Sequence, residues 1–150
     1  MKIGFYYIFI ILSFGCMNSH AQDLNSHQWE NRIIIVKTTD IASEKFQAQL
    51  NEFKNVANEM IERKFVFYMI VGDDFTFINY KDLTLNNVGK IYGKLAKILN
   101  DKYDFEIILI GLDGGIKLKQ VEVITYKKLF DKVDSMPMRS NEIRRKQKKN

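Results

Sequence analysis

The chain has 150 residues, a formal net charge of +5 and one cysteine. A single cysteine excludes an internal disulfide, so an ordinary core must hold the fold, and a domain of this size buries roughly two-thirds of its unfolded surface. Residues 22–138 carry 16 Lys and Arg against 17 Asp and Glu, whereas residues 139–150 carry six against one. The basic excess therefore belongs to a C-terminal tail, which we expect to be solvated and frayed, and it gives no reason to expect nucleic acid as a partner.

The first 21 residues predict a secretory signal peptide. Lys2 precedes the apolar run GFYYIFIILSF (residues 4–14), and Ser19 and Ala21 are small residues at the positions required for cleavage after Ala21. The run is too short to span a bilayer, which takes roughly 20 apolar residues. We therefore expect an exported protein, in the periplasm or outside the cell, with no transmembrane segment in the mature chain.

Cys16 permits an alternative, in which the protein is a lipid-anchored lipoprotein of the envelope. Gly15 is small, as the residue before a lipidated cysteine must be. However, Ser13 and Phe14 occupy the positions where a lipoprotein signal usually has leucine followed by a small residue. We therefore favour cleavage after Ala21, which removes the only cysteine with the leader.

The first half of the mature chain predicts two strands and two helices. Residues 32–37 (RIIIVK) form a continuous β-branched run, typical of a strand buried on both faces, and apolar residues then recur at helical spacing over residues 43–63. Residues 65–71 (FVFYMIV) predict the second strand. Residues 73–82 are interpreted as a polar and aromatic connection, and residues 84–99 as a helix.

The second half predicts a hairpin followed by a helix. Residues 105–110 (FEIILI) and 116–124 are strand candidates, and GLDGG between them contains the Asp-Gly pair that is typical of a tight turn. Thr125 is placed to cap a last helix, which Pro137 ends.

These elements predict an α/β fold of thioredoxin-like type. The expected sheet is mixed and four-stranded, with order 2-1-3-4, strand 3 antiparallel and helices on both faces. A flavodoxin-like sheet needs a helix between every pair of strands, and GLDGG leaves no room for one. We divide the chain into a signal peptide (1–21), a thioredoxin-like domain (22–138) and a basic tail (139–150).

Four short segments resemble a known family: WENR (29–32), ER (62–63), IGLDGGIK (110–117) and VDSMPMR (133–139). In these segments the chain resembles a thioredoxin-like, peroxiredoxin-related family of unknown function. That family occurs in bacterial exported proteins and as modules in vertebrate sushi-repeat and coiled-coil matrix proteins. The resemblance covers nearly the whole mature chain, implies a thioredoxin-like fold and leaves the activity open.

The usual catalytic sets are missing from the mature sequence. Thioredoxin and peroxiredoxin relatives place a reactive cysteine in the loop after the first strand, where the thiolate is the nucleophile. The corresponding loop, residues 38–43, has no sulfur. His27 is the only histidine after the leader, and the carboxylate pairs Asp73/Asp74 and Asp101/Asp104 lack the spacing of a known metal loop. We therefore predict no catalytic residue, no metal and no cofactor.

Three groups of residues are candidates for binding. One is the polar loop at the start of the first helix, where an anion site competes with simple helix capping. The second is Trp29, for which packing over the sheet end is the alternative. The third surrounds Pro137, where we expect Arg139 to fold back and pair with a carboxylate. The candidates are Thr38, Thr39, Asp40, Trp29, Met136, Met138 and Arg139.

Two classes of function follow. The first is a non-catalytic module that binds an unknown protein or small ligand, which the missing catalytic sets favour. The second is a peroxiredoxin-related or thioredoxin-related oxidoreductase, which rests on the family resemblance alone and conflicts with the missing cysteine.

Overall fold

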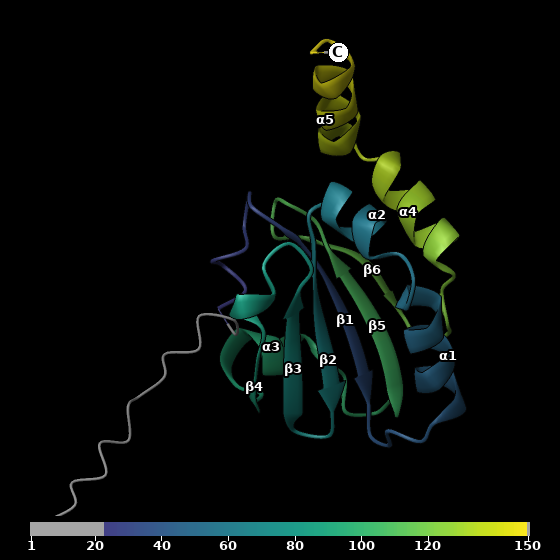
Figure 1. Ribbon diagram of the computed structural model, residues 1–150. Helices are drawn as coiled ribbons and strands as arrows, with labels where there is room; N and C mark the ends of the chain where they lie inside the picture. The colour runs from purple at the N-terminus through teal and green to yellow at the C-terminus, as the bar shows by residue number, and fades with distance from the viewer. Residues whose placement is uncertain (1–22, 150) are drawn as a thin grey trace, which may run out of the picture.

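The computed structural model describes residues 23–149, which fold around one six-stranded mixed sheet of order β4-β3-β2-β1-β5-β6 (Figure 1). The predicted signal peptide, Cys16 and the cleavage position after Ala21 lie outside the described residues. None of the helices between residues 23 and 149 is both long enough and apolar enough to cross a bilayer.

The four strands that the sequence predicts, β2, β1, β5 and β6, have the predicted order and orientations. β1 (Arg32–Thr38) runs parallel to β2 (Phe65–Val71) on one side and antiparallel to β5 (Phe105–Ile110) on the other. β5 then pairs with antiparallel β6 (Ile116–Gln120). Every residue of β1 and β5 is buried, because helices or loops cover both faces of the middle of the sheet.

Two further strands make the prediction of a four-stranded sheet wrong. The segment predicted as a connection contains β3 (Asp74–Asn79), and the predicted helix over residues 84–99 contains β4 (Asn87–Lys90). Both strands are antiparallel to their neighbours and extend the sheet beyond β2. A short 3-10 turn, η2 (Leu83–Leu85), precedes β4, and only α3 (Gly93–Ile98) of the expected helix is helical.

Local signals for β3 were present in the sequence. Gly72 and Asp73 form a two-residue connection between β2 and β3, with Gly72 at a φ of +59°, which glycine adopts without strain. Phe75 and Phe77 are buried and alternate with less buried residues, the period of a strand with one buried face. Phe75 and Phe77 indicate a strand by their two-residue spacing, which the composition of the segment alone does not reveal.

Three helices cover one face of the sheet (Figure 1). They are α1 (Glu44–Phe53), α2 (Ala57–Glu62) and α4 (Tyr126–Asp134). The single helix predicted over residues 43–63 is divided in two at residues 54–56. Thr125 caps α4 as predicted, since its hydroxyl accepts a hydrogen bond from the amide of Lys128.

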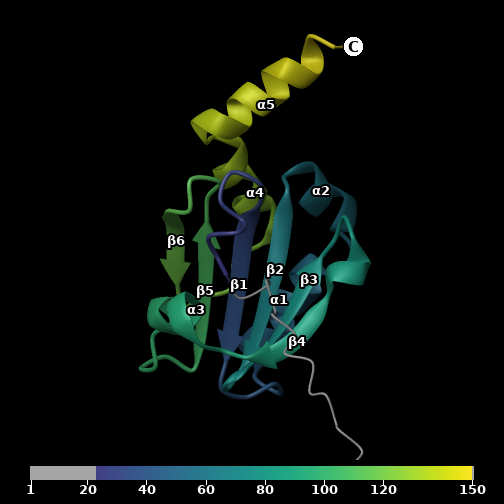
Figure 2. The same ribbon diagram turned by 90° about the vertical axis from the view of Figure 1, so that its left-hand side faces the viewer.

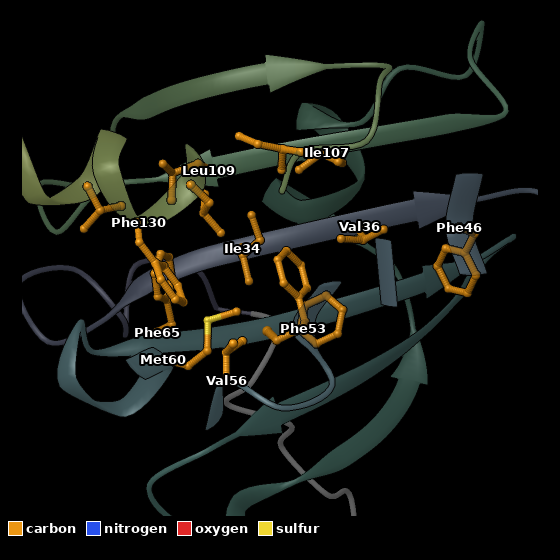
Figure 3. Packing of buried hydrophobic residues seen from close by; sticks show 14 of the residues in the cluster. Ile34, Val36, Phe46, Phe53, Val56, Met60, Phe65, Ile107, Leu109 and Phe130 are labelled. Carbon is orange, nitrogen blue, oxygen red and sulfur yellow. The ribbon is translucent and has the colours of Figure 1, made fainter. Parts of the chain in front are cut away.

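The core of this face consists of side chains from all three helices and from β1, β2 and β5 (Figure 3). Phe46 and Phe53 project from α1 and Met60 from α2, while Phe130 comes from α4. Burying an aliphatic or aromatic side chain stabilises a fold by roughly 1.5–3 kcal/mol. This face therefore carries a large share of the stability.

The opposite face is covered by α3 and by residues 23–31 (Figure 2). Leu95 and Leu24 are the buried anchors of these two segments. His27 is buried against Tyr68 and Phe77, and its Nε2 lies 3.0 Å from the Tyr68 hydroxyl. His27 is therefore a packing residue of this layer.

The C-terminal residues form a last helix, α5 (Pro137–Gln147), which projects away from the sheet (Figures 1 and 2). Pro137 does not simply end the preceding helix, because it occupies the first turn of α5, where a missing amide is tolerated. The predicted boundary between domain and tail, at residues 138 and 139, falls inside this helix.

Candidate functional site

The four segments that carry the family resemblance lie together at one end of the sheet, beside the start of β1. The amide of Trp29 donates to the carbonyl of Leu112 over 2.6 Å, which joins residues 23–31 to the hairpin turn. Arg32 Nη1 donates to the carbonyl of Arg63 over 2.8 Å, which joins β1 to the end of α2. Figure 2 shows the start of α5, the β5–β6 turn and residues 23–31 gathered at this end.

A cluster of charged side chains connects α2, α4, α5 and β1 at this end. Arg63 makes a bidentate ion pair with Asp134, in which Nε donates to Oδ1 over 3.0 Å and Nη2 donates to Oδ2 over 2.6 Å. Arg139 Nε donates to the same carboxylate over 3.0 Å. We call this set the ion cluster, and it comprises Arg32, Glu62, Arg63, Asp134, Arg139 and Glu142.

Arg139 is the centre of the ion cluster, and its predicted fold-back onto a carboxylate is confirmed. It is only 5% exposed. Besides Asp134 it contacts Glu62 Oε1 at 3.1 Å and Glu142 Oε2 at 3.4 Å, and its Nη1 donates to the carbonyl of Glu62. The expectation that the segment from residue 139 onward is a frayed tail is wrong at its start, because these contacts anchor the first turn of α5.

The ion cluster lowers the pKa of two carboxylates, those of Asp134 and Glu62. Partial burial raises the pKa of Asp134, but the hydrogen bonds from Arg63 and Arg139 outweigh burial and hold it below its ordinary value. The hydrogen bond from Arg139 likewise lowers the pKa of Glu62, against a smaller opposing effect of burial. Both carboxylates are therefore stabilised in their charged form at neutral pH.

A pocket of about 340 Å³ lies next to the ion cluster, between the β5–β6 turn and the start of α5. We call it the hairpin pocket, and its walls are Arg32, Gly111, Leu112, Asp113, Lys117, Met136, Pro137 and Met138. Arg32 is only 1% exposed, and burial lowers its pKa while Glu142 opposes that shift. Its Nε is buried and has no hydrogen-bond partner.

Asp113 and Lys117 form the other wall of the hairpin pocket. Lys117 Nζ lies 2.6 Å from Asp113 Oδ2, and Asp113 Oδ1 accepts the amide of Gly115 over 3.0 Å. The hydrogen bonds from Lys117 and Gly115 lower the pKa of Asp113. Gly114 has a φ of +77°, so the predicted turn depends on a glycine at this position. Asp113 therefore has the predicted role in turn geometry and also lines the pocket.

Trp29 stands beside this end of the sheet without packing over it. Its side chain is 60% exposed, and its φ of +69° is unusual for a bulky residue. The alternative of packing over the sheet end is therefore wrong.

Met136 and Met138, which the sequence predicts as binding residues, line the hairpin pocket. Arg32, Asp113 and Lys117 line it too, although the sequence analysis does not propose them for binding. A charged residue at the start of a fully buried strand was the available signal for Arg32.

Comparison with family models returned one described as a domain of unknown function (DUF4174), over residues 23–142. The chain belongs to the DUF4174 family. The matched region contains every residue of the ion cluster and the hairpin pocket and ends inside α5. Neither the curated proteins nor the solved structures gave a significant match.

The polar loop at the other end of β1 is occupied by its own contacts in this DUF4174 domain. The Thr38 hydroxyl accepts the amide of Asp40 over 3.2 Å, and Asp40 Oδ1 accepts the amide of Ala42 over 2.9 Å. Thr39 donates its amide to the carbonyl of Asp104, which ties the loop to the start of β5. Ser43 stands at the helix N-cap but makes no side-chain cap bond. The structure thus separates Thr38, Thr39 and Asp40 from the other candidates.

A second hollow, of about 400 Å³, lies on the face of the sheet that carries α1. Leu50, Phe53, Phe67 and Tyr80 are among its walls, and burial raises the pKa of Tyr80 to about 12. No charged group other than Lys54 lines it. Among residues 23–149, no group of three or more His, Cys, Asp or Glu side chains is placed to hold a metal ion.

Proposed function

We propose that this protein is an exported, non-catalytic binding domain with a thioredoxin-like fold, and that the hairpin pocket is its binding site. The observation that carries the proposal is the pocket, whose walls come from segments far apart in the sequence and include the buried Arg32. Its volume falls in the range of small-molecule pockets, roughly 300–1,000 Å³. A small ligand is therefore the favoured partner.

The arrangement of β2, β1, β5 and β6 supports the thioredoxin-like assignment. The order β2-β1-β5-β6 combines a parallel pair, joined through α1 and α2, with a terminal antiparallel hairpin, and helices lie on both faces. β3 and β4 then extend one edge as an additional hairpin.

The non-catalytic part of the proposal rests on sulfur chemistry. A thiol cycle needs a cysteine, and residues 22–150 contain none. The purified protein is expected to show no peroxide or disulfide turnover above a heat-denatured control. Turnover above that control would favour the peroxiredoxin-related alternative.

Export rests on the leader sequence. N-terminal sequencing and intact-mass measurement of the protein from its native host are expected to give a chain that begins at Gln22. A chain that begins at an acylated Cys16 would instead establish the lipoprotein alternative.

The binding role is tested by a fragment screen against isotope-labelled protein, followed by NMR amide shifts. Binders are expected to move the signals of residues 111–117 and 136–139, which surround the hairpin pocket. If fragments move only signals around the second hollow, such as those of Leu50 and Tyr80, the hairpin pocket is not the site.

A further inference from the structure

The hairpin pocket has an excess of positive charge among its walls. Its ionisable lining groups are Arg32, Lys117 and Asp113. The carboxylate of Asp113 is already engaged by Lys117 at 2.6 Å and by the amide of Gly115 at 3.0 Å. The other charged group among the walls is Arg32, which Glu142 contacts at 3.3 Å.

Arg32 has donor capacity that the protein itself does not use. Its Nη1 donates to the carbonyl of Arg63 and to Glu142, but its buried Nε has no partner. A buried donor without an acceptor is costly, and such groups are rare in folded proteins. The planar fork of a guanidinium matches the oxygen pairs of carboxylates and phosphates. An acceptor supplied by a ligand in the pocket would remove this cost.

The N-terminus of α5 provides a second positively polarised group beside the hairpin pocket. Met136 is the N-cap residue and makes no side-chain cap bond. The first backbone hydrogen bond of α5 runs from the amide of Ser140 to the carbonyl of Met136. The amides of Met138 and Arg139 come before it and therefore have no acceptor within the helix. Such amides, together with the helix dipole, attract anions. Residues 136–138 line the pocket, so this helix end borders it.

The remaining walls are apolar and adaptable. Leu112 is buried, and Met136, Pro137 and Met138 complete the surface. Methionine side chains adjust their shape to varied ligands because they are unbranched and flexible. The pocket therefore combines one polar end with an apolar wall.

We infer that the hairpin pocket binds a small molecule with a single anionic group, a carboxylate or a phosphate, on an apolar stem. The anionic group faces Arg32 and the start of α5, and the stem lies against Met136 and Met138. This inference rests on the proposed function and specifies the class of ligand for the same pocket.

The test compares four probes of equal stem length by NMR titration of the labelled protein. They are hexanoate, hexyl phosphate, neutral hexanamide and cationic hexylamine. We expect the two anions to saturate the shifts of residues 111–117 and 136–139 at concentrations at least about tenfold lower than the other two probes, as one well-placed ionic contact implies. The difference between hexanoate and hexyl phosphate distinguishes a carboxylate site from a phosphate site.

Two matched pairs of variants locate the anionic group. Met138→Glu adds a carboxylate in the first turn of α5, where it favours the helix, and it is expected to weaken hexanoate binding about tenfold or more. Met138→Gln, of similar size but neutral, should change it far less. Lys117→Gln should weaken binding severalfold, whereas Lys127→Gln removes the same charge from an exposed position on α4 and should not.

The outcomes separate the two proposals. If hexanamide or hexylamine binds in the hairpin pocket as tightly as hexanoate, the site stands and the anionic ligand class is overturned. The ligand class also fails if Met138→Glu and Met138→Gln weaken hexanoate equally. If none of the four probes moves the signals around the pocket, this inference fails, and a negative fragment screen would then remove the proposed function as well.

Discussion

The two ends of strand β1 use their polar residues differently. At the Thr38 end, the loop forms its bonds mainly with neighbours two residues away, as Thr38 does with Asp40 and Asp40 with Ala42. At the Arg32 end, the side chain of Arg32 bonds residues 31 and 110 positions away, Arg63 and Glu142. The Arg32 end also borders the hairpin pocket, which has charged walls.

This difference teaches which end can form a site. A loop that satisfies its own polar groups has few left for a ligand. Where segments distant in sequence meet, they bring together polar side chains that have no hydrogen-bond partner within their own segment. The unpartnered Nε of Arg32 is the clearest example.

The largest expected effect concerns the ion cluster. Arg139→Ala leaves the carboxylates of Asp134, Glu62 and Glu142 without their shared partner, and it should lower the free energy of unfolding by about 3 kcal/mol. Urea unfolding measures the change. Arg145→Ala removes the same charge from an exposed position of α5 and should cost less than about 0.5 kcal/mol. Equal effects of the two substitutions would contradict a structural role for Arg139.

Acid is expected to destabilise the fold mainly at the Arg32 end of β1, where Asp134 and Glu62 lie. The pKa values of Asp134 and Glu62 are lowered in the folded state, so the unfolded chain takes up protons first on acidification. Their contribution to stability is thus complete above the ordinary pKa values of 3.8 and 4.5 and is lost as the pH falls through the lower folded values.

Urea unfolding at several pH values tests whether stability falls with pH in this direction. The free energy of unfolding of the parent protein should fall between about pH 5 and pH 2. Arg139→Ala should show a shallower decline, since Glu62 loses its main partner and Asp134 loses one of its two. A decline of the same slope in both proteins would assign the acid sensitivity to other groups.

A smaller effect is expected at the Thr38 end. Asp40→Ala removes the bond to the amide of Ala42 and should cost about 1 kcal/mol. The same substitution should leave the binding of hexanoate unchanged, because this loop lies at the opposite end of β1. Weakened binding in Asp40→Ala, at unchanged fold, would mean that the two ends are coupled.

The smallest change in stability is expected for Asp113→Asn. An amide oxygen can still accept the amide of Gly115, and an exposed ion pair with Lys117 contributes only about 0–1 kcal/mol. Binding of hexanoate should tighten, because Lys117 is released and a negative charge leaves the pocket wall. Weaker binding of the anion in this variant would argue against the proposed ligand class.

The prediction of the fold succeeded for continuous apolar runs and turn residues and was wrong for β3 and β4, which extend the sheet beyond β2. The continuous apolar runs of β1, β2 and β5 and the Asp-Gly turn lead directly to β1, β2, β5 and β6. Val88 and Tyr92 suggested a helix by their spacing, yet both side chains are exposed. Residues 87–90 form a strand because pairing with β3 satisfies their backbone, which is a tertiary contact.

The sequence by itself determined the identity of the inner strands, the hairpin turn and the lack of a thiol after Cys16, because periodicity, turn residues and composition are local properties. Only the tertiary structure decided that Arg32, Lys117, Met136 and Met138 border one pocket and that Arg139 anchors α5. Contacts between residues as far apart as Arg32 and Glu142 depend on how strands and helices pack, and no local pattern encodes them.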